Sequence, residues 1–163
     1  MMKILVISDT HGGTDALAAA IGAERAAEVV FHLGDGAWDM DRVRDAFPEK
    51  AVLTVRGNCD GGFLADHPES GVVSLASHRV FYCHGHRYAY GGMEDALANA
   101  AKEAGADIAL FGHTHAPFFE KRGDVYLCNP GSLCRPRGTA HGTYGLLTLS
   151  EAAVDFTVKE FLL

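Results

Sequence analysis

Side chains of types that bind metal ions follow one apolar run after another along this sequence, at five separate places. Each cluster alone is typical of a polar loop with a capping Asp or an exposed His. Five clusters, each directly after an apolar run, favour one shared site over five unrelated loops. In chain order they are Asp9-Thr10-His11, Gly34-Asp35, Gly57-Asn58, His84-Gly85-His86 and Gly112-His113-Thr114-His115.

The candidate ligands offer only oxygen and nitrogen atoms, from carboxylates, one amide and imidazoles. This mixture suits first-row divalent ions, and affinity alone does not choose among them. Seven protein ligands are too many for one catalytic ion that keeps an open position. They suit two ions about 3.5–4 Å apart that share one carboxylate. The seven are Asp9, His11, Asp35, Asn58, His84, His113 and His115.

The apolar runs before these clusters are predicted to be buried β-strands. In the first third of the chain they alternate with segments of helical spacing, which is typical of parallel strands joined by crossover helices. Sites in such sheets form in the crevice at the carboxyl ends of the strands, where the clusters would meet. The predicted strands are residues 3–8, 29–33 and 51–55, and the predicted helices are residues 14–27, capped by Thr14 or Asp15, and 39–47.

The pattern changes after residue 70, where strands predominate. We expect a hairpin, one further helix and a C-terminal third that is antiparallel or mixed. The sequence contains no repeat or linker, so residues 1–163 are predicted to form a single domain, an α/β sandwich of two sheets with helices outside. The predicted elements are the hairpin 72–76 and 79–83, the helix 93–104, and strands 107–111, 125–128, 143–149 and 154–161.

Composition limits the classes of function. The formal net charge is -7, which argues against stable, nonspecific binding of nucleic acid. No apolar run approaches the ~18 residues that a membrane span needs, and the N-terminus lacks the features of a signal peptide. We therefore expect a cytoplasmic protein that makes no membrane contact. The four cysteines form no C-x-x-C pair, and Cys83 and Cys128 are predicted to be ordinary buried thiols.

The clusters and their order resemble the calcineurin-like metallophosphoesterase superfamily. Its motifs run D-x-H, G-D-x-x-x-D, G-N-H-[DE], H and G-H-x-H, and this chain matches them between residues 9 and 115. The short length, the Arg56-Gly57-Asn58-Cys59-Asp60 stretch, and Asn129-Pro130-Gly131-Ser132 with its following arginines are most similar to the small YfcE-like phosphodiesterase branch.

The resemblance implies a four-layer αββα sandwich with two mixed sheets. It also implies hydrolysis of a phosphodiester in a small substrate, by attack of a hydroxide that bridges two divalent ions. Mn²⁺ is the favoured ion, with Fe, Zn²⁺, Ni²⁺ and Mg²⁺ as alternatives. By this resemblance, the first ion takes Asp9, His11, Asp35 and His115, and the second takes Asp35, Asn58, His84 and His113.

Cys59 occupies the position where the wider superfamily has a His that is thought to protonate the leaving group. A thiol is mostly protonated at pH 7, yet it is a weak hydrogen-bond donor. General acid catalysis is typically worth ~10²–10⁴-fold. We therefore expect either a preference for esters with good leaving groups or another acid, for which His86 is the nearest candidate. The catalytic candidates are Asp35, Asn58, Cys59 and His86.

Four other charged residues near the motifs have open roles. Asp60 is predicted to be a turn carboxylate that accepts backbone N–H groups. Asp39 is expected to begin a helix, with the alternative of accepting a hydrogen bond from a ligand His. Arg135 and Arg137 either approach the substrate phosphate or form a solvated turn.

Three alternative functions remain open at this stage. A phosphomonoesterase or nucleotidase would share the same metal chemistry. A non-catalytic scaffold of the retromer type would predict eroded ligand positions, whereas all are filled here. A nuclease is disfavoured by the acidic balance. The loops 60–70 and 86–92 would shape the substrate pocket but reveal no natural substrate, and a homo-oligomer is possible.

Overall fold

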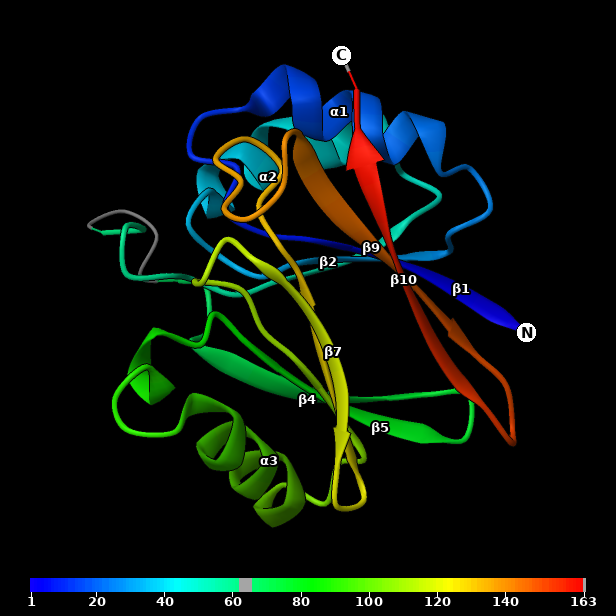
Figure 1. Ribbon diagram of the computed structural model, residues 1–163. Coiled ribbons are helices and arrows are strands. Elements are labelled where there is room, and N and C mark those ends of the chain that lie inside the picture. The colour runs from blue at the N-terminus through cyan, green and yellow to red at the C-terminus, as the bar shows by residue number, and fades with distance from the viewer. Residues whose placement is uncertain (62–65, 163) are drawn as a thin grey trace.

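The computed structural model describes residues 1–61 and 66–162, and it shows two β-sheets packed face to face with helices outside (Figure 1). Each sheet has five strands, and each is mixed. The first has the order β10 (Val154–Phe161), β9 (Gly142–Leu149), β1 (Met2–Ile7), β2 (Val29–His32) and β3 (Ala51–Thr54). The second has the order β4 (Ser70–Leu75), β5 (His78–Cys83), β6 (Ile108–Leu110), β8 (Val125–Pro130) and β7 (Pro117–Arg122).

The helices complete the four layers. The first sheet is covered by α1 (Thr14–Ala23) and α2 (Ala37–Val43), and the second by α3 (Met93–Glu103) (Figure 1). Two short 3₁₀ turns, η1 (Arg44–Ala46) and η3 (His86–Tyr88), follow α2 and β5. The αββα sandwich predicted from the sequence is therefore confirmed.

The uninterrupted apolar sequence of β1 follows from burial of both of its faces. Ile4 and Val6 point into the core between the sheets, while Leu5 and Ile7 point into the core beneath α1 and α2. Successive side chains of a strand alternate between faces, so a strand covered on both sides must be apolar at every position.

The strand directions bring the polar clusters together. β1, β2 and β3 run parallel in the first sheet, as do β5, β6 and β8 in the second. The residues that follow β1, β2, β3, β5 and β6 therefore share the carboxyl edge of their sheet. A backbone hydrogen bond from the His113 amide to Asp9 Oδ2, 3.1 Å long, joins the two edges.

Several predicted elements differ from those observed. The helix expected to reach residue 27 ends at Ala23, and Gly13 precedes it without any side-chain cap, so neither Thr14 nor Asp15 caps it. The helix expected at 39–47 is divided into α2 and η1. β7 is not predicted from the sequence, because Phe118-Phe119-Glu120-Lys121 shows no alternation. As an edge strand that begins with Pro117, β7 needs none. No helix within the described ranges is both long and apolar enough to cross a bilayer.

Candidate metal centre

The first group of candidate ligands gathers at the carboxyl ends of β1 and β6. Atoms of Asp9, His11 and His115 that could bind a metal all lie within 4.8 Å of one another. His115 Nε2 is 3.1 Å from Asp9 Oδ1 and 3.2 Å from His11 Nε2. These three residues belong to the set that the resemblance implies for the first ion.

The second group lies beside it, and Asp35 stands between the two. Asp35 Oδ2 is 4.0 Å from His11 Nε2 on one side and 3.3 Å from His84 Nε2 on the other. Asn58 Oδ1 is 3.2 Å from His84 Nε2. The His113 ring lies 5.2 Å from the His84 ring, measured between centroids. The fold thus brings all seven candidate ligands into one cluster.

Two of the imidazoles are oriented by main-chain carbonyls. His84 Nδ1 lies 2.7 Å from the carbonyl oxygen of Leu33, and His115 Nδ1 lies 2.7 Å from that of Arg135. A carbonyl can only accept, so each Nδ1 carries the proton and donates it. In the neutral imidazole each Nε2 then keeps its lone pair for a metal ion, as is usual for metal-binding histidines.

Several candidate ligands have a backbone conformation that residues other than glycine rarely adopt. Six residues other than glycine have positive φ within the described ranges, and five of them are candidate ligands. Left-handed backbone costs free energy for such residues and clusters at functional sites. The five and their φ values are Asp9 (55°), His11 (45°), Asp35 (52°), His113 (67°) and His115 (61°).

One buried oxygen of Asp9 has no hydrogen-bond partner among the residues that the structure describes. Asp9 Oδ2 accepts hydrogen bonds from Ser8 Oγ at 2.5 Å and from the His113 amide. Asp9 Oδ1 is buried and accepts none. Leaving a buried carboxylate oxygen unsatisfied costs free energy, and a cation at this point would remove the cost. The donor set and this oxygen therefore fit divalent metal ions.

Neighbouring side chains in the cluster shift the pKa values of its acids and histidines. Burial opposes the charged form of Asp35, but the hydrogen bond and charge of His84 hold the pKa of that carboxyl well below its usual range. The carboxylate of Asp9, whose Oδ1 lies 3.1 Å from His115 Nε2, raises the pKa of His115. Burial lowers the pKa of His11 and of His113. Protons on His84 and His115 would compete with a metal ion, so metal affinity should fall as pH falls.

Comparison with known proteins now decides the family. The family model of the calcineurin-like phosphoesterase superfamily domain matches residues 2–152. This chain belongs to that superfamily. Its sequence is 34% identical over 157 residues to a probable metallophosphoesterase, YsnB, of Bacillus subtilis, covering 93% of this chain and 87% of that protein. It is 32% identical over 168 residues to the phosphodiesterase YfcE of Escherichia coli, covering 90% and 88%.

Solved structures agree with this membership. A predicted phosphoesterase of Streptococcus pneumoniae superposes with a TM-score of 0.81 at 28% identity, covering 98% of this chain and 89% of that one. Vps29 of Entamoeba histolytica superposes with a TM-score of 0.74 at 22% identity, covering 99% and 100%. At that identity the second likeness shows the fold alone.

Cys59 lies at the rim of the cluster of candidate ligands. Its backbone N–H donates to Asp35 Oδ1 at 2.7 Å, and its side chain is exposed. Partial burial, followed by the hydrogen bond and charge of Asp35, raises the pKa of the Cys59 thiol to about 11. The thiol therefore keeps its proton at neutral pH. The ring of His86, the other candidate acid, lies 5.5 Å from that of His84, and burial lowers its pKa.

Asp60 is the turn carboxylate that the sequence predicts, and its reach is longer than expected. Asp60 Oδ2 accepts the N–H groups of Gly57 at 2.8 Å and Asp35 at 2.7 Å. Asp60 Oδ1 accepts those of Gly36 at 2.9 Å and Ala37 at 3.2 Å. The close packing also explains the glycine, because a Cβ at position 57 would collide with Asp35. Asp60 thus fixes the backbone that carries Asp35.

Asp39 supports the metal site without contacting a candidate ligand His, contrary to the alternative raised from the sequence. It lies in the first turn of α2 and is buried. Asp39 Oδ2 accepts Thr10 Oγ1 at 2.5 Å and the Gly12 N–H at 2.9 Å, and Oδ1 accepts Thr14 Oγ1 at 3.1 Å. Asp39 therefore holds the loop that carries Asp9 and His11.

A directional chain of hydrogen bonds continues from Thr10 to the end of β2. The Thr10 hydroxyl donates its hydrogen bond to Asp39, so Thr10 Oγ1 accepts a hydrogen bond from the Nε2–H of His32 at 3.1 Å. His32 Nδ1 then accepts the N–H of Gly34 at 3.3 Å. His32 and Thr10 are fully buried. The chain ties the loop after β1 to the residue before Asp35, and so helps to set the separation of the two carboxylates.

The arginines of the loop after β8 contribute main chain to the site. The Arg135 carbonyl orients His115, while its N–H binds Ser132 Oγ at 2.8 Å. Ser132 Oγ in turn donates to the Asp9 carbonyl at 2.7 Å. The side chains of Arg135 and Arg137 are exposed, so contact with a substrate phosphate stays a prediction.

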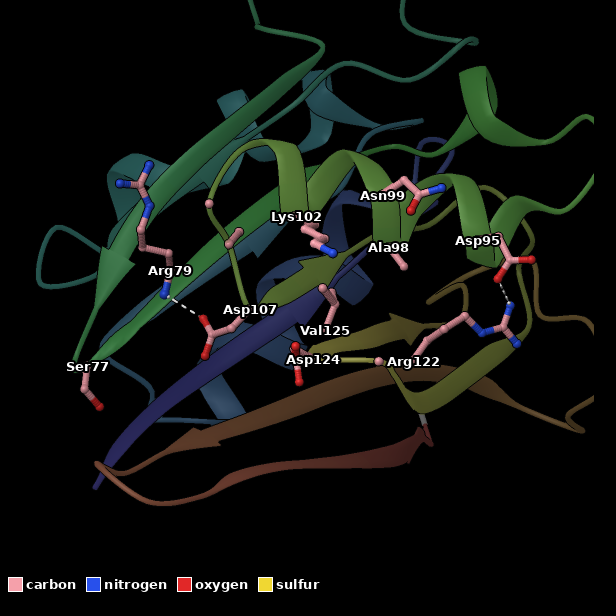
Figure 2. A pocket seen from close by; sticks show the side chains of 13 residues that line it. Ser77, Arg79, Asp95, Ala98, Asn99, Lys102, Asp107, Arg122, Asp124 and Val125 are labelled. Carbon is pink, nitrogen blue, oxygen red and sulfur yellow. Dashed lines mark hydrogen bonds and ion pairs between the residues drawn. The ribbon is translucent and has the colours of Figure 1, made fainter.

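A cavity of about 850 Å³ lies between α3 and the amino ends of β5, β6 and β8, and no candidate ligand lines it. Figure 2 shows the side chains around this cavity. Its charges are largely satisfied internally: Arg122 pairs with Asp95 at 3.0 Å, and Asp107 accepts the Arg79 N–H at 2.8 Å. Size therefore does not mark the catalytic site in this fold.

Proposed function

We propose that this protein is a phosphodiesterase that uses two divalent metal ions to hydrolyse a small phosphodiester. The observation that carries the proposal is the convergence of Asp9, Asp35 and the imidazoles around a buried carboxylate oxygen that no described residue pairs with. Membership of the superfamily and the similarity to the Escherichia coli phosphodiesterase support it.

The candidate ligands divide around Asp35. Asp9, His11 and His115 would hold the first ion, and Asn58, His84 and His113 the second, with Asp35 shared. When bound, the ions would lower the pKa of a water molecule and neutralise charge on the phosphoryl oxygens. Asp60 and Asp39 keep the two carboxylates in position through the backbone bonds described above.

Protonation of the leaving group distinguishes this chain from relatives with His at position 59. Cys59 keeps its proton at neutral pH, but a thiol donates weakly. His86 is the second candidate donor. We propose that the site favours diesters, because a diester carries one negative charge and repels an attacking anion less than a monoester does.

The test is a metal-dependent assay of matched substrates. The protein is stripped with a chelator, reloaded with Mn²⁺, Mg²⁺, Zn²⁺, Fe²⁺ or Ni²⁺, and assayed with bis(p-nitrophenyl) phosphate and p-nitrophenyl phosphate. We expect two ions per chain and faster turnover of the diester, with Mn²⁺ the favoured ion. Faster turnover of the monoester would favour the phosphatase alternative. A folded protein that holds two ions yet hydrolyses neither substrate would contradict the enzyme and favour the scaffold.

A further inference from the structure

A cavity of about 600 Å³ adjoins the residues expected to hold the second ion. Asn58 and His113 line it and are also candidate ligands. A phosphoester bound at the metal cluster would therefore place one of its ester groups at this cavity. The described lining residues are Asn58, His86, Arg87, Ala89, Tyr90 and His113.

Tyr90 provides an aromatic surface that the protein itself does not cover. The residue is 90% exposed, although it lines the cavity just after η3. Aromatic side chains usually bury 150–250 Å² in a core or an interface. An exposed ring at the wall of a cavity beside the metal cluster is therefore available to stack on a ligand.

The charge of the cavity favours an uncharged group over a second phosphate. Arg87 is the sole guanidinium or ammonium group among the described lining residues. Its Nη2 donates to Glu69 Oε1 at 2.6 Å, and Arg56 Nη2 donates to the same oxygen at 3.0 Å. Arg87 is thus already engaged with an anion, while its flat guanidinium remains suited to stacking.

We propose that this cavity binds an uncharged planar ring of the substrate, with Tyr90 as the stacking platform. This specificity rests on the proposed phosphodiesterase function, and it names the substrate class as aromatic phosphodiesters. Stacking of a planar base on an aromatic side chain is worth about 1–3 kcal/mol, which corresponds to about 5- to 150-fold in affinity.

Two phosphonates isolate the ring from the anionic group. Methylphosphonate and phenylphosphonate share one head group and differ only in the ring. Calorimetric titration uses the full chain, loaded with the divalent ion that supports its highest activity. We expect phenylphosphonate to bind about 5- to 150-fold more tightly than methylphosphonate to the natural protein and to Tyr90→Phe. In Tyr90→Ala the two affinities should become nearly equal, with that for methylphosphonate unchanged.

Phe119→Ala is the control, because Phe119 is a half-exposed ring on β7 that does not line the cavity. It should keep the preference for phenylphosphonate. Equal binding of both phosphonates by the natural protein, or a Tyr90→Ala variant that keeps the full preference or loses both affinities equally, would overturn the stacking site and leave the phosphodiesterase intact. Failure of the loaded protein to bind phenylphosphonate would overturn the stacking site, whereas the proposed function is decided separately by hydrolysis of bis(p-nitrophenyl) phosphate.

Discussion

The candidate ligands combine a strained backbone with accurately oriented side chains. Left-handed φ at Asp9, Asp35 and His115 is unfavourable in isolation, and the surrounding hydrogen bonds must maintain it. His84 and His115 each donate a hydrogen bond from Nδ1 to a main-chain carbonyl, which leaves Nε2 as the atom that can bind a metal ion. These contacts orient both imidazoles for a ligand role.

The first prediction separates ligands from the rim thiol. Asp35→Ala and Asn58→Ala should abolish turnover of bis(p-nitrophenyl) phosphate, because each removes a candidate metal ligand. Cys59→Ser should change turnover less than about tenfold, since the thiol is a weak donor and a hydroxyl can replace it. Steady-state kinetics with metal analysis tests both. A large loss in Cys59→Ser with full metal content would assign the thiol a chemical role.

At the scale of elements, the site depends on how two loops are tied together. The loop after β1 carries Asp9 and His11, and the turn after β2 carries Asp35. The buried chain from Asp39 through Thr10 and His32 to Gly34 spans the gap between them. Outer partners of this kind affect metal affinity about 10–100-fold when they are removed.

The second prediction concerns this chain of hydrogen bonds. Thr10→Val keeps the shape but leaves the His32 Nε2–H unpaired and removes one bond from Asp39. We expect affinity for Mn²⁺, measured by titration calorimetry, to fall about tenfold or more, and Thr10→Ser to restore it. Thr143→Val is a matched control, because it removes the bond of another buried threonine hydroxyl, 2.7 Å long, to the Pro130 carbonyl.

Urea unfolding should show a similar loss of stability, about 1–3 kcal/mol, in Thr10→Val and Thr143→Val. Only the former should lose metal affinity. Equal affinities in these two variants would show that the chain of bonds does not position the metal site.

At the scale of the whole molecule, burial of polar groups links folding to pH. His32 is fully buried between strand and loop, and burial lowers its pKa from 6.5 to about 4, despite opposing carboxylates. The folded state therefore holds His32 neutral. Between pH 4 and 6.5 the unfolded chain binds more protons at this site, so stability falls as pH falls through that range.

The third prediction is the size and origin of that loss. Lowering the pKa of His32 from 6.5 to about 4 corresponds to a loss of roughly 3 kcal/mol in the free energy of unfolding between pH 6.5 and pH 4. Urea unfolding in the presence of a chelator should show this decline in the natural protein and a shallower one in His32→Gln. Parallel declines in the two proteins would assign the pH dependence to other groups.

The sequence by itself determined the fold class and where polar residues meet. Strand direction in the first third of the chain follows from alternation of strands with helices, and parallel strands bring their carboxyl ends together, so Asp9 and Asp35 had to share an edge. His113 follows a strand of the other sheet, and the packing of the two sheets places it beside Asp9. The same local reasoning foresaw Asp60 as an acceptor of backbone N–H groups. It failed at the end of α1 and at β7, where tertiary packing and edge position outweigh local pattern.

Only the tertiary structure decided which residues support the site and what lies beside it. Thr10 is far in sequence from His32 and Asp39, and no local pattern shows that hydrogen bonds are donated in one direction from Gly34 through these residues to Asp39. Likewise, only the tertiary structure shows that the exposed ring of Tyr90 lines the same cavity as Asn58 and His113. The types of the candidate ligands can be read from the local sequence. The hydrogen bonds that position them and the cavity beside them arise from contacts between distant segments of the chain.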